Sequence, residues 1–171
     1  MAVIKKAEKS ENYLLSKLGK ETFLESHGNS ASHTDISLYV AQNYSSNAFK
    51  NELTDSNNLY HIIYHEEIPA GFSKINLNSS HPDIPFNNVT KFDRLYVLKE
   101  YYNMKLGLQL FEYNLSISKN NGQDGMWLFV WKENERAVNF YRKAGFEIIG
   151  SYDFKISEDH SNPNYQMLLK Y

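Results

Sequence analysis

The spacing of apolar residues changes along the chain between the period of a helix and the period of a strand. Residues 2–7 can form a short strand, after which apolar residues recur at roughly helical spacing from Tyr13 to the Gly28 break. Thr34 is an N-cap candidate for a second helix, and residues 48–53 are expected to add a short helical piece. The first third of the chain is therefore predicted to be mostly helical.

Strand-like and helix-like segments alternate from residue 59 onward. Residues 59–64 and 70–77 alternate β-branched and aromatic positions around a turn region at residues 66–69, as in an antiparallel hairpin. The polar stretch 78–88 contains two prolines and is the clearest loop. The later elements are predicted as strand, helix, strand, helix and two strands, over residues 92–98, 106–118, 126–131, 134–144, 146–154 and 165–171. This order predicts an α/β protein with a mixed sheet of about six or seven strands and helices on both faces, in one domain over residues 1–171.

Composition and charge exclude several classes of protein. The formal net charge is −2 with acids and bases interspersed, so no basic stripe is available for nucleic acid. Without cysteine there are no disulfides, thiolate metal sites or cysteine nucleophiles, and the six histidines show no compact ligand spacing, so no metal is expected. No segment approaches the ~20 apolar residues of a membrane span, and the first residues lack the apolar run of a signal peptide. We therefore expect a cytoplasmic protein with no nucleic-acid or membrane partner.

The stretch 95–110 carries the first candidate site. A strand runs there through a short loop into a helix, and the N–H groups of the first helical turn lack intrahelical partners, so they can bind an anion such as a pyrophosphate. Gly107 lets a ligand or a neighbouring backbone approach closely, and Lys105 adds a positive charge. The alternative is an ordinary strand–loop–helix crossover in which Gly107 serves packing.

This stretch resembles motif A of the Gcn5-related N-acetyltransferase (GNAT) family, in which a strand like Leu-Tyr-Val-Leu-Pro-Glu-Tyr precedes a Gln/Arg-x-x-Gly-x-Gly/Ala loop. The chain keeps Gly107 but has Lys99 at the Pro, Tyr102 at the Gln/Arg and Lys105 at the first Gly. The resemblance implies the GNAT fold and acetyl-CoA or coenzyme A as co-substrate. It also implies that the strand end and loop bind CoA through Leu95, Tyr96, Val97, Asn103, Met104, Lys105, Leu106, Gly107, Leu108 and Gln109, with the Tyr96 and Val97 N–H groups on the thioester and pantetheine.

Residues 127–146 resemble GNAT motif B, Val-x-x-x-Asn-x-x-Ala-x-x-Phe-Tyr-x-Lys-x-Gly-Phe, almost without exception. Asn134 can simply cap a helix, but in similar proteins the corresponding residue also contacts the pantetheine arm. The resemblance implies that Tyr141 points at the CoA sulfur and protonates the departing thiolate, and it adds Lys143 to the CoA contacts. The alternative for Tyr141 is a half-buried tyrosine with a satisfied hydroxyl. Gly145 is expected to end the helix in the left-handed conformation.

The acceptor side is the least determined part of the sequence. The segment 21–28 is similar to bacterial polyamine acetyltransferases of the spermine/spermidine type, and Glu21 and Glu25 lie one helical turn apart, where both can attract a cationic amine. An ordinary solvated helix face is the alternative. Asp93 and Glu100 are the nearest candidates for a general base, which stays unassigned. Asp93 is also expected, with Glu21 and Glu25, to contact the acceptor.

The sequence thus predicts an N-acetyltransferase that moves an acetyl group from acetyl-CoA to a primary amine by direct attack. A small-molecule amine such as a polyamine is the favoured acceptor, and analogy with similar proteins suggests a homodimer. The alternative is a catalytically weak GNAT-fold module that binds CoA as a sensor or structural ligand.

Overall fold

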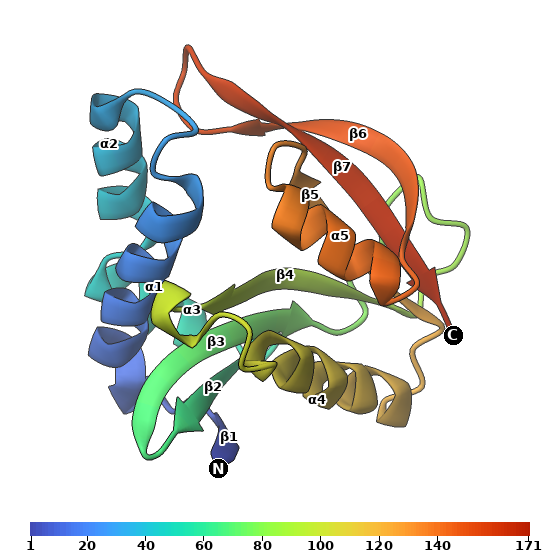
Figure 1. Cartoon of the computed structure of the whole chain (residues 1–171). Helices are drawn as coiled ribbons and strands as arrows, with labels where there is room; N and C mark the ends of the chain where they lie inside the picture. Colours follow the sequence, from blue (N-terminus) through green and yellow to red (C-terminus); the bar gives the residue numbers. More distant parts are fainter. The chain divides into compact units, whose positions relative to one another are not determined.

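The computed structural model describes the whole chain, residues 1–171 (Figure 1). Its strands are β1 (Ala2–Lys6), β2 (Leu59–His65), β3 (Ile68–Asn76), β4 (Val89–Val97), β5 (Gly125–Trp131), β6 (Glu147–Lys155) and β7 (Ser161–Lys170). Its helices are α1 (Asn12–His27), α2 (His33–Asn43), α3 (Ser46–Thr54), α4 (Leu106–Asn120) and α5 (Glu135–Lys143), with short 3₁₀ helices η1 (Lys9–Glu11) and η2 (Lys99–Tyr101).

The strands form one seven-stranded sheet in the order β1-β2-β3-β4-β5-β7-β6. β4 pairs with β5 in parallel, whereas β1 with β2, β2 with β3, β5 with β7 and β6 with β7 pair antiparallel. The parallel pair requires a crossover, which α4 supplies between β4 and β5. The predicted mixed sheet is therefore confirmed.

The contacts divide the chain into two compact units. Unit 1 contains Met1–Ile75 and Arg94–Asn114, and unit 2 contains Asn76–Asp93 and Leu115–Tyr171. The chain passes from one unit to the other three times, at the end of β3, within β4 and within α4. The single domain expected over residues 1–171 stays a prediction.

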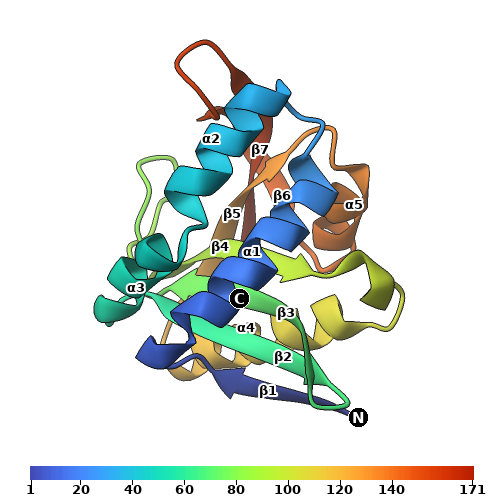
Figure 2. The ribbon, with the colours of Figure 1, turned by 90° about the vertical axis from the view of Figure 1, so that its left-hand side faces the viewer.

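In unit 1, helices cover both faces of the strands (Figure 1, Figure 2). On one face, the rings of Tyr60 and Phe72 lie 5.7 Å and 6.2 Å from the ring of Phe49 on α3. On the other face, His61 contacts α4 through a 3.1 Å hydrogen bond between its Nδ1 and Asn114 Oδ1. Neighbouring residues of β2 thus face opposite helices, as the period of a strand requires.

Two local predictions in unit 1 need correction. α2 is capped by Ser32, whose hydroxyl accepts a 3.1 Å hydrogen bond from the N–H of Asp35, so Thr34 lies inside the first turn and is not the N-cap. The hairpin turn is also shorter than residues 66–69. Glu66 and Glu67 both have positive φ, 49° and 66°, which is the type I′ pattern, and β3 begins directly afterwards at Ile68.

In unit 2, the predicted loop 78–88 is packed against the sheet. The indole N–H of Trp127 donates to the Ser79 carbonyl at 2.7 Å, and the Gln166 side-chain N–H donates to His81 Nδ1 at 3.0 Å. Ile84 from the same loop belongs to a buried apolar cluster with Trp127. The loop is therefore a structured part of unit 2.

None of the five helices is both long and apolar enough to span a membrane.

Candidate functional site

The end of β4 is held close to β3 at the level of the backbone. A Cβ atom added at Gly71 would lie only 2.4 Å from the carbonyl oxygen of Tyr96 and 3.0 Å from Cα of Val97, so any side chain at position 71 would collide with β4. One residue further on, the N–H of Leu98 donates to the Ala70 carbonyl at 2.9 Å. These contacts fix the point at which the chain leaves the strand and enters the motif A loop.

The loop that follows contains two non-glycine residues in the left-handed region. Asn103 has φ 69° and Lys105 has φ 59°. Lys105 occupies the first Gly of the motif A pattern, and it adopts the conformation that glycine takes without strain, at a cost of about 1 to 2 kcal/mol for a residue with a Cβ. Lys105 thus provides a left-handed backbone at this point of the loop without a glycine.

The start of α4 presents backbone donors next to Gly107. The first bond of the helical ladder runs from the Gln109 N–H to the Lys105 carbonyl at 3.1 Å, so the N–H groups of Leu106, Gly107 and Leu108 precede that ladder. A Cβ at Gly107 would meet only Val97 Cγ2, at an ordinary 3.8 Å, and φ of Gly107 is not positive. Neither packing nor backbone conformation requires glycine here.

Several of the predicted CoA contacts have side chains that pack in the core of unit 1. Leu106 is 2% exposed and clusters with Leu110, Ile63 and Ala70, and the side chains of Leu95 and Val97 pack against that cluster. Leu106 can therefore contact a ligand only through its backbone, whereas Leu95 and Val97 are only partly buried. The side chains of Met104 and Leu108, in contrast, are 44% and 38% exposed.

Motif B forms the helix α5 with both ends capped. The Asn134 side-chain oxygen accepts a 3.2 Å hydrogen bond from the Ala137 N–H, which confirms the capping role. At the other end Gly145 has φ 100°, its N–H donates to the Arg142 carbonyl, and the Phe146 N–H donates to the Tyr141 carbonyl, each at 3.0 Å. This is the Schellman arrangement, so the predicted left-handed glycine is confirmed.

Tyr141 lies on the buried face of α5. Its side chain is 8% exposed and its ring meets the rings of Phe92, Phe140 and Phe146 edge-on, with centroid distances of 6.4, 5.3 and 5.5 Å. Burial raises the pKa of the Tyr141 phenol well above its ordinary value, so the hydroxyl stays protonated at neutral pH. Lys143, two residues further on, is exposed.

The three carboxylates predicted for the acceptor lie in different environments. Glu21 is exposed on α1. Glu25, one turn later, accepts a 2.8 Å hydrogen bond from the backbone N–H of Lys99, at the start of the motif A loop. Asp93 forms a 2.9 Å ion pair with Lys91. The structure thus gives Glu25 a partner within the protein.

His27 is a residue that the motifs did not single out. Its ring stacks on Phe23 at 5.0 Å and meets Tyr96, a predicted CoA contact, edge-on at 6.2 Å. Burial lowers the pKa of His27 to about 4, so the imidazole is neutral at physiological pH. The spacing of four residues from Phe23 is the signal that places His27 on the inner face of α1.

No group of three or more His, Asp or Glu side chains lies close enough together to hold a metal ion.

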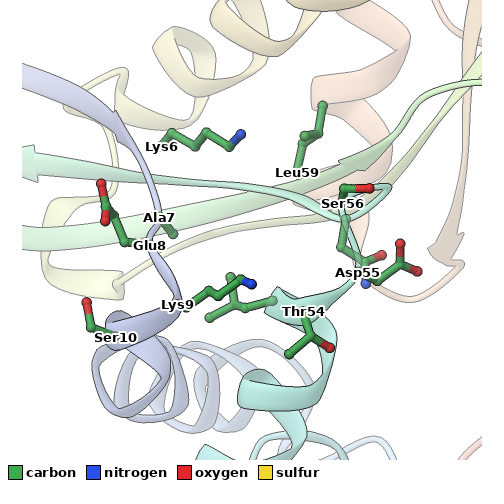
Figure 3. A pocket seen from close by; sticks show the side chains of 11 residues that line it. Lys6, Ala7, Glu8, Lys9, Ser10, Thr54, Asp55, Ser56 and Leu59 are labelled. Carbon is green, nitrogen blue, oxygen red and sulfur yellow. The ribbon is translucent and has the colours of Figure 1, made fainter.

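A separate polar pocket opens in unit 1 (Figure 3). Its volume is about 680 Å³, and its lining includes Lys6, Lys9 and Ser10 before α1 and Thr54, Asp55 and Ser56 after α3. Glu25 contacts the motif A loop from the other end of α1. The pocket contains none of the predicted site residues and is not part of the candidate site.

The chain matches the model of the Acetyltransferase (GNAT) family over residues 22–146. It is 24% identical to an uncharacterized N-acetyltransferase from the pepI 3′ region of Lactobacillus delbrueckii subsp. lactis. The 142 aligned residues cover 83% of this chain and 82% of the relative. In fold it is similar to the PaiA N-acetyltransferase of Thermoplasma acidophilum in complex with coenzyme A, with a TM-score of 0.80, 22% identity and coverage of 100% and 99%. It is also similar to the ribosomal-protein-S18-alanine N-acetyltransferase of Escherichia coli, with a TM-score of 0.72, 16% identity and coverage of 99% and 94%.

These matches, together with the loop and helix geometry, define the class of protein. The chain belongs to the GNAT acetyltransferase family. It is an acetyl-CoA-dependent N-acetyltransferase with the GNAT fold. Of these three names, only that of the Escherichia coli enzyme states an acceptor.

Proposed function

We propose that the protein transfers an acetyl group from acetyl-CoA to the nitrogen of a small primary amine by direct attack, with Tyr141 as the general acid. The observation that carries this proposal is the conjunction of a glycine that the fold itself does not need, Gly107, with backbone donors at the start of a 15-residue helix. The family membership supplies the reaction class.

The motif A loop of unit 1 is proposed to bind the CoA pyrophosphate. The N–H groups of Leu106, Gly107 and Leu108 point out of the N-terminal end of α4, where the helix dipole favours negative charge. Lys105 adds an ammonium group at the same place. Because Gly107 has no side chain, a phosphate oxygen can reach these donors. The backbone N–H groups of Tyr96 and Val97 are proposed to hold the thioester carbonyl and the pantetheine.

In unit 2, Tyr141 is proposed to protonate the leaving group. The amine nitrogen forms a bond to the acetyl carbon, the carbon–sulfur bond breaks, and the sulfur takes the proton of the Tyr141 hydroxyl. The amine loses its own proton to a base or to water, and that base stays unassigned. Burial keeps the Tyr141 phenol protonated at neutral pH, and a general acid must hold its proton before the thiolate departs. Asn134 is proposed to contact the pantetheine arm in addition to capping α5.

For the acceptor we favour a small cationic amine such as a polyamine. The support is the resemblance of residues 21–28 to bacterial polyamine acetyltransferases, together with the exposed carboxylate of Glu21. The carboxylate of Asp93 is already paired with Lys91 at 2.9 Å and adds no support. Glu25 is left out of this set because its carboxylate is bound to the Lys99 N–H. A charged acceptor predicts that the KM for the amine rises with ionic strength, because exposed charge pairs are screened by salt.

The proposal is tested by titrating acetyl-CoA, CoA and desulfo-CoA calorimetrically and then measuring thiol release with polyamines, aminoglycosides, amino acids and short peptides. Binding together with release on one amine class establishes the transferase and names its substrate. Binding of CoA without release on any amine would refute the catalytic proposal and favour the sensor or structural module. A chain that binds none of the three would refute both functions.

A further inference from the structure

We propose that Glu25 is a positioning residue that holds the loop between β4 and α4 in its CoA-binding conformation. This inference rests on the proposed function of that loop. It differs from the role that sequence spacing suggested for Glu25, in which the carboxylate would attract a cationic acceptor directly.

The contact is a helix cap supplied from a distant part of the chain. Lys99 is the first residue of η2, and the residue before it, Leu98, makes no side-chain capping bond. Glu25 Oε2, 74 positions earlier on α1, accepts the Lys99 N–H at 2.8 Å instead. A side-chain oxygen is the usual acceptor for an N–H at the start of a helix that has no partner within the helix.

Two successive backbone N–H groups therefore tie the entry of the loop to two different elements. The Leu98 N–H is bound by the Ala70 carbonyl of β3, and the Lys99 N–H by Glu25 of α1. Asn103 and Lys105, which follow η2 within four residues, both have a left-handed backbone. A non-glycine residue stays in the left-handed region only when the contacts around it hold the backbone there. The Glu25 bond is one of the constraints that do so.

The carboxylate is itself carried by a fixed part of α1. Phe23, two residues before it, is 2% exposed and its ring lies 5.0 Å from Tyr39 and 5.1 Å from Tyr44. His27, two residues after it, packs against Tyr96 of β4. A side chain on such a segment can set the position of the loop, because the helix cannot follow the loop if the loop moves.

The positioning role depends on a hydrogen-bond acceptor and not on a negative charge. Glu25→Gln keeps a side-chain oxygen at the same reach, whereas Glu25→Ala removes it. If Glu25 instead bound the cationic acceptor, Glu25→Gln would behave like Glu25→Ala, because an amide cannot neutralise a cationic amine. The two substitutions therefore separate geometry from charge at one position.

The experiment compares wild type, Glu25→Ala, Glu25→Gln and Glu112→Ala, the last being an exposed glutamate of α4, in CoA titrations and in steady-state assays with both substrates varied. We expect Glu25→Ala to raise the Kd for CoA and the KM for acetyl-CoA about five-fold, as for the loss of one net hydrogen bond. The KM for the amine stays unchanged. Glu25→Gln and Glu112→Ala stay within about two-fold of wild type.

Two results would overturn this role. If Glu25→Gln and Glu25→Ala both raise the KM for the amine and leave CoA binding intact, the carboxylate binds the acceptor. If Glu25→Ala binds CoA like wild type, the bond to Lys99 has no role in the site. Both differ from failure of the proposed function, in which wild type itself binds no CoA and this role falls with it.

Discussion

Replacing Gly107 by alanine should move stability and CoA affinity in opposite directions. The added Cβ would have Val97 Cγ2 as its nearest neighbour at 3.8 Å, an ordinary van der Waals contact, and the backbone of Gly107 is already one that alanine adopts. Gly→Ala at a compatible helical position stabilises by about 0.4 to 1 kcal/mol, because the unfolded chain loses conformational freedom. We therefore expect Gly107→Ala to raise the free energy of unfolding by about that amount.

The same methyl group occupies the space that a phosphate oxygen needs at the start of α4. Losing one charge-assisted hydrogen bond costs about 1.5 to 3 kcal/mol, so the Kd for CoA should rise by roughly ten- to a hundred-fold. Urea unfolding followed by tryptophan fluorescence gives the stability, and calorimetric titration gives the Kd. Glu112→Ala, on the same helix, is the control that should leave the Kd unchanged.

Either of two outcomes would refute this reasoning. A fall in the free energy of unfolding would mean that Gly107 serves packing after all, as in an ordinary crossover. An unchanged Kd would mean that no phosphate approaches the backbone at this residue. The two measurements are independent, so each half of the argument is tested alone.

Three further predictions concern Tyr141, Lys105 and His61. Tyr141→Phe should lower the rate of thiol release by about a hundred-fold or more while the Kd for CoA stays within two-fold, and an unchanged rate would exclude the general-acid role. Lys105→Gly should raise the free energy of unfolding by about 1 kcal/mol by relieving a left-handed residue, and a decrease would contradict that interpretation. Burial lowers the pKa of His61 to about 4, against 6.5 when unfolded, so its stabilising contribution is present above pH 6.5 and is lost as the pH falls to 4. His61 should account for about 3 kcal/mol of the fall in the free energy of unfolding from pH 7 to pH 4, to which His27, with a similarly lowered pKa, adds its own part. Urea unfolding should show that this fall shrinks by about that amount in His61→Gln, and an equal fall in the variant would refute the assignment.

Much of the candidate site could be predicted from local pattern. The Asn134 cap and the left-handed Gly145 were predicted correctly, because both depend on residues within a few positions of each other. The N-cap of α2 was misplaced by two residues. Ser32 and Thr34 both have hydroxyls that can cap, and only the extended backbone at Ser32 selects between them.

The contacts of individual side chains with distant elements could not be predicted. The spacing of Glu21 and Glu25 correctly placed two carboxylates one turn apart on α1, but it gave no information about Lys99, which lies 74 positions from Glu25. The buried residues of α5 are Val138 and Tyr141, whereas Ala137, Phe140 and Ala144 are half-buried. A period of 3.6 residues shows that a helix has an inner face, but neighbours outside the helix decide which face that is.

The sequence by itself determined the order of strands and helices, the family, and the positions of the loop and helix that carry motifs A and B, because these follow from local periodicity and from residues close together in the chain. Only the tertiary structure decided that Gly107 is not needed for packing, that Lys105 adopts the backbone conformation of a glycine, and that Glu25 binds the main chain of the loop. Those properties depend on atoms of residues that are distant in the sequence, such as Glu25 and Lys99, and on backbone angles. The sequence pattern contains neither distances nor angles.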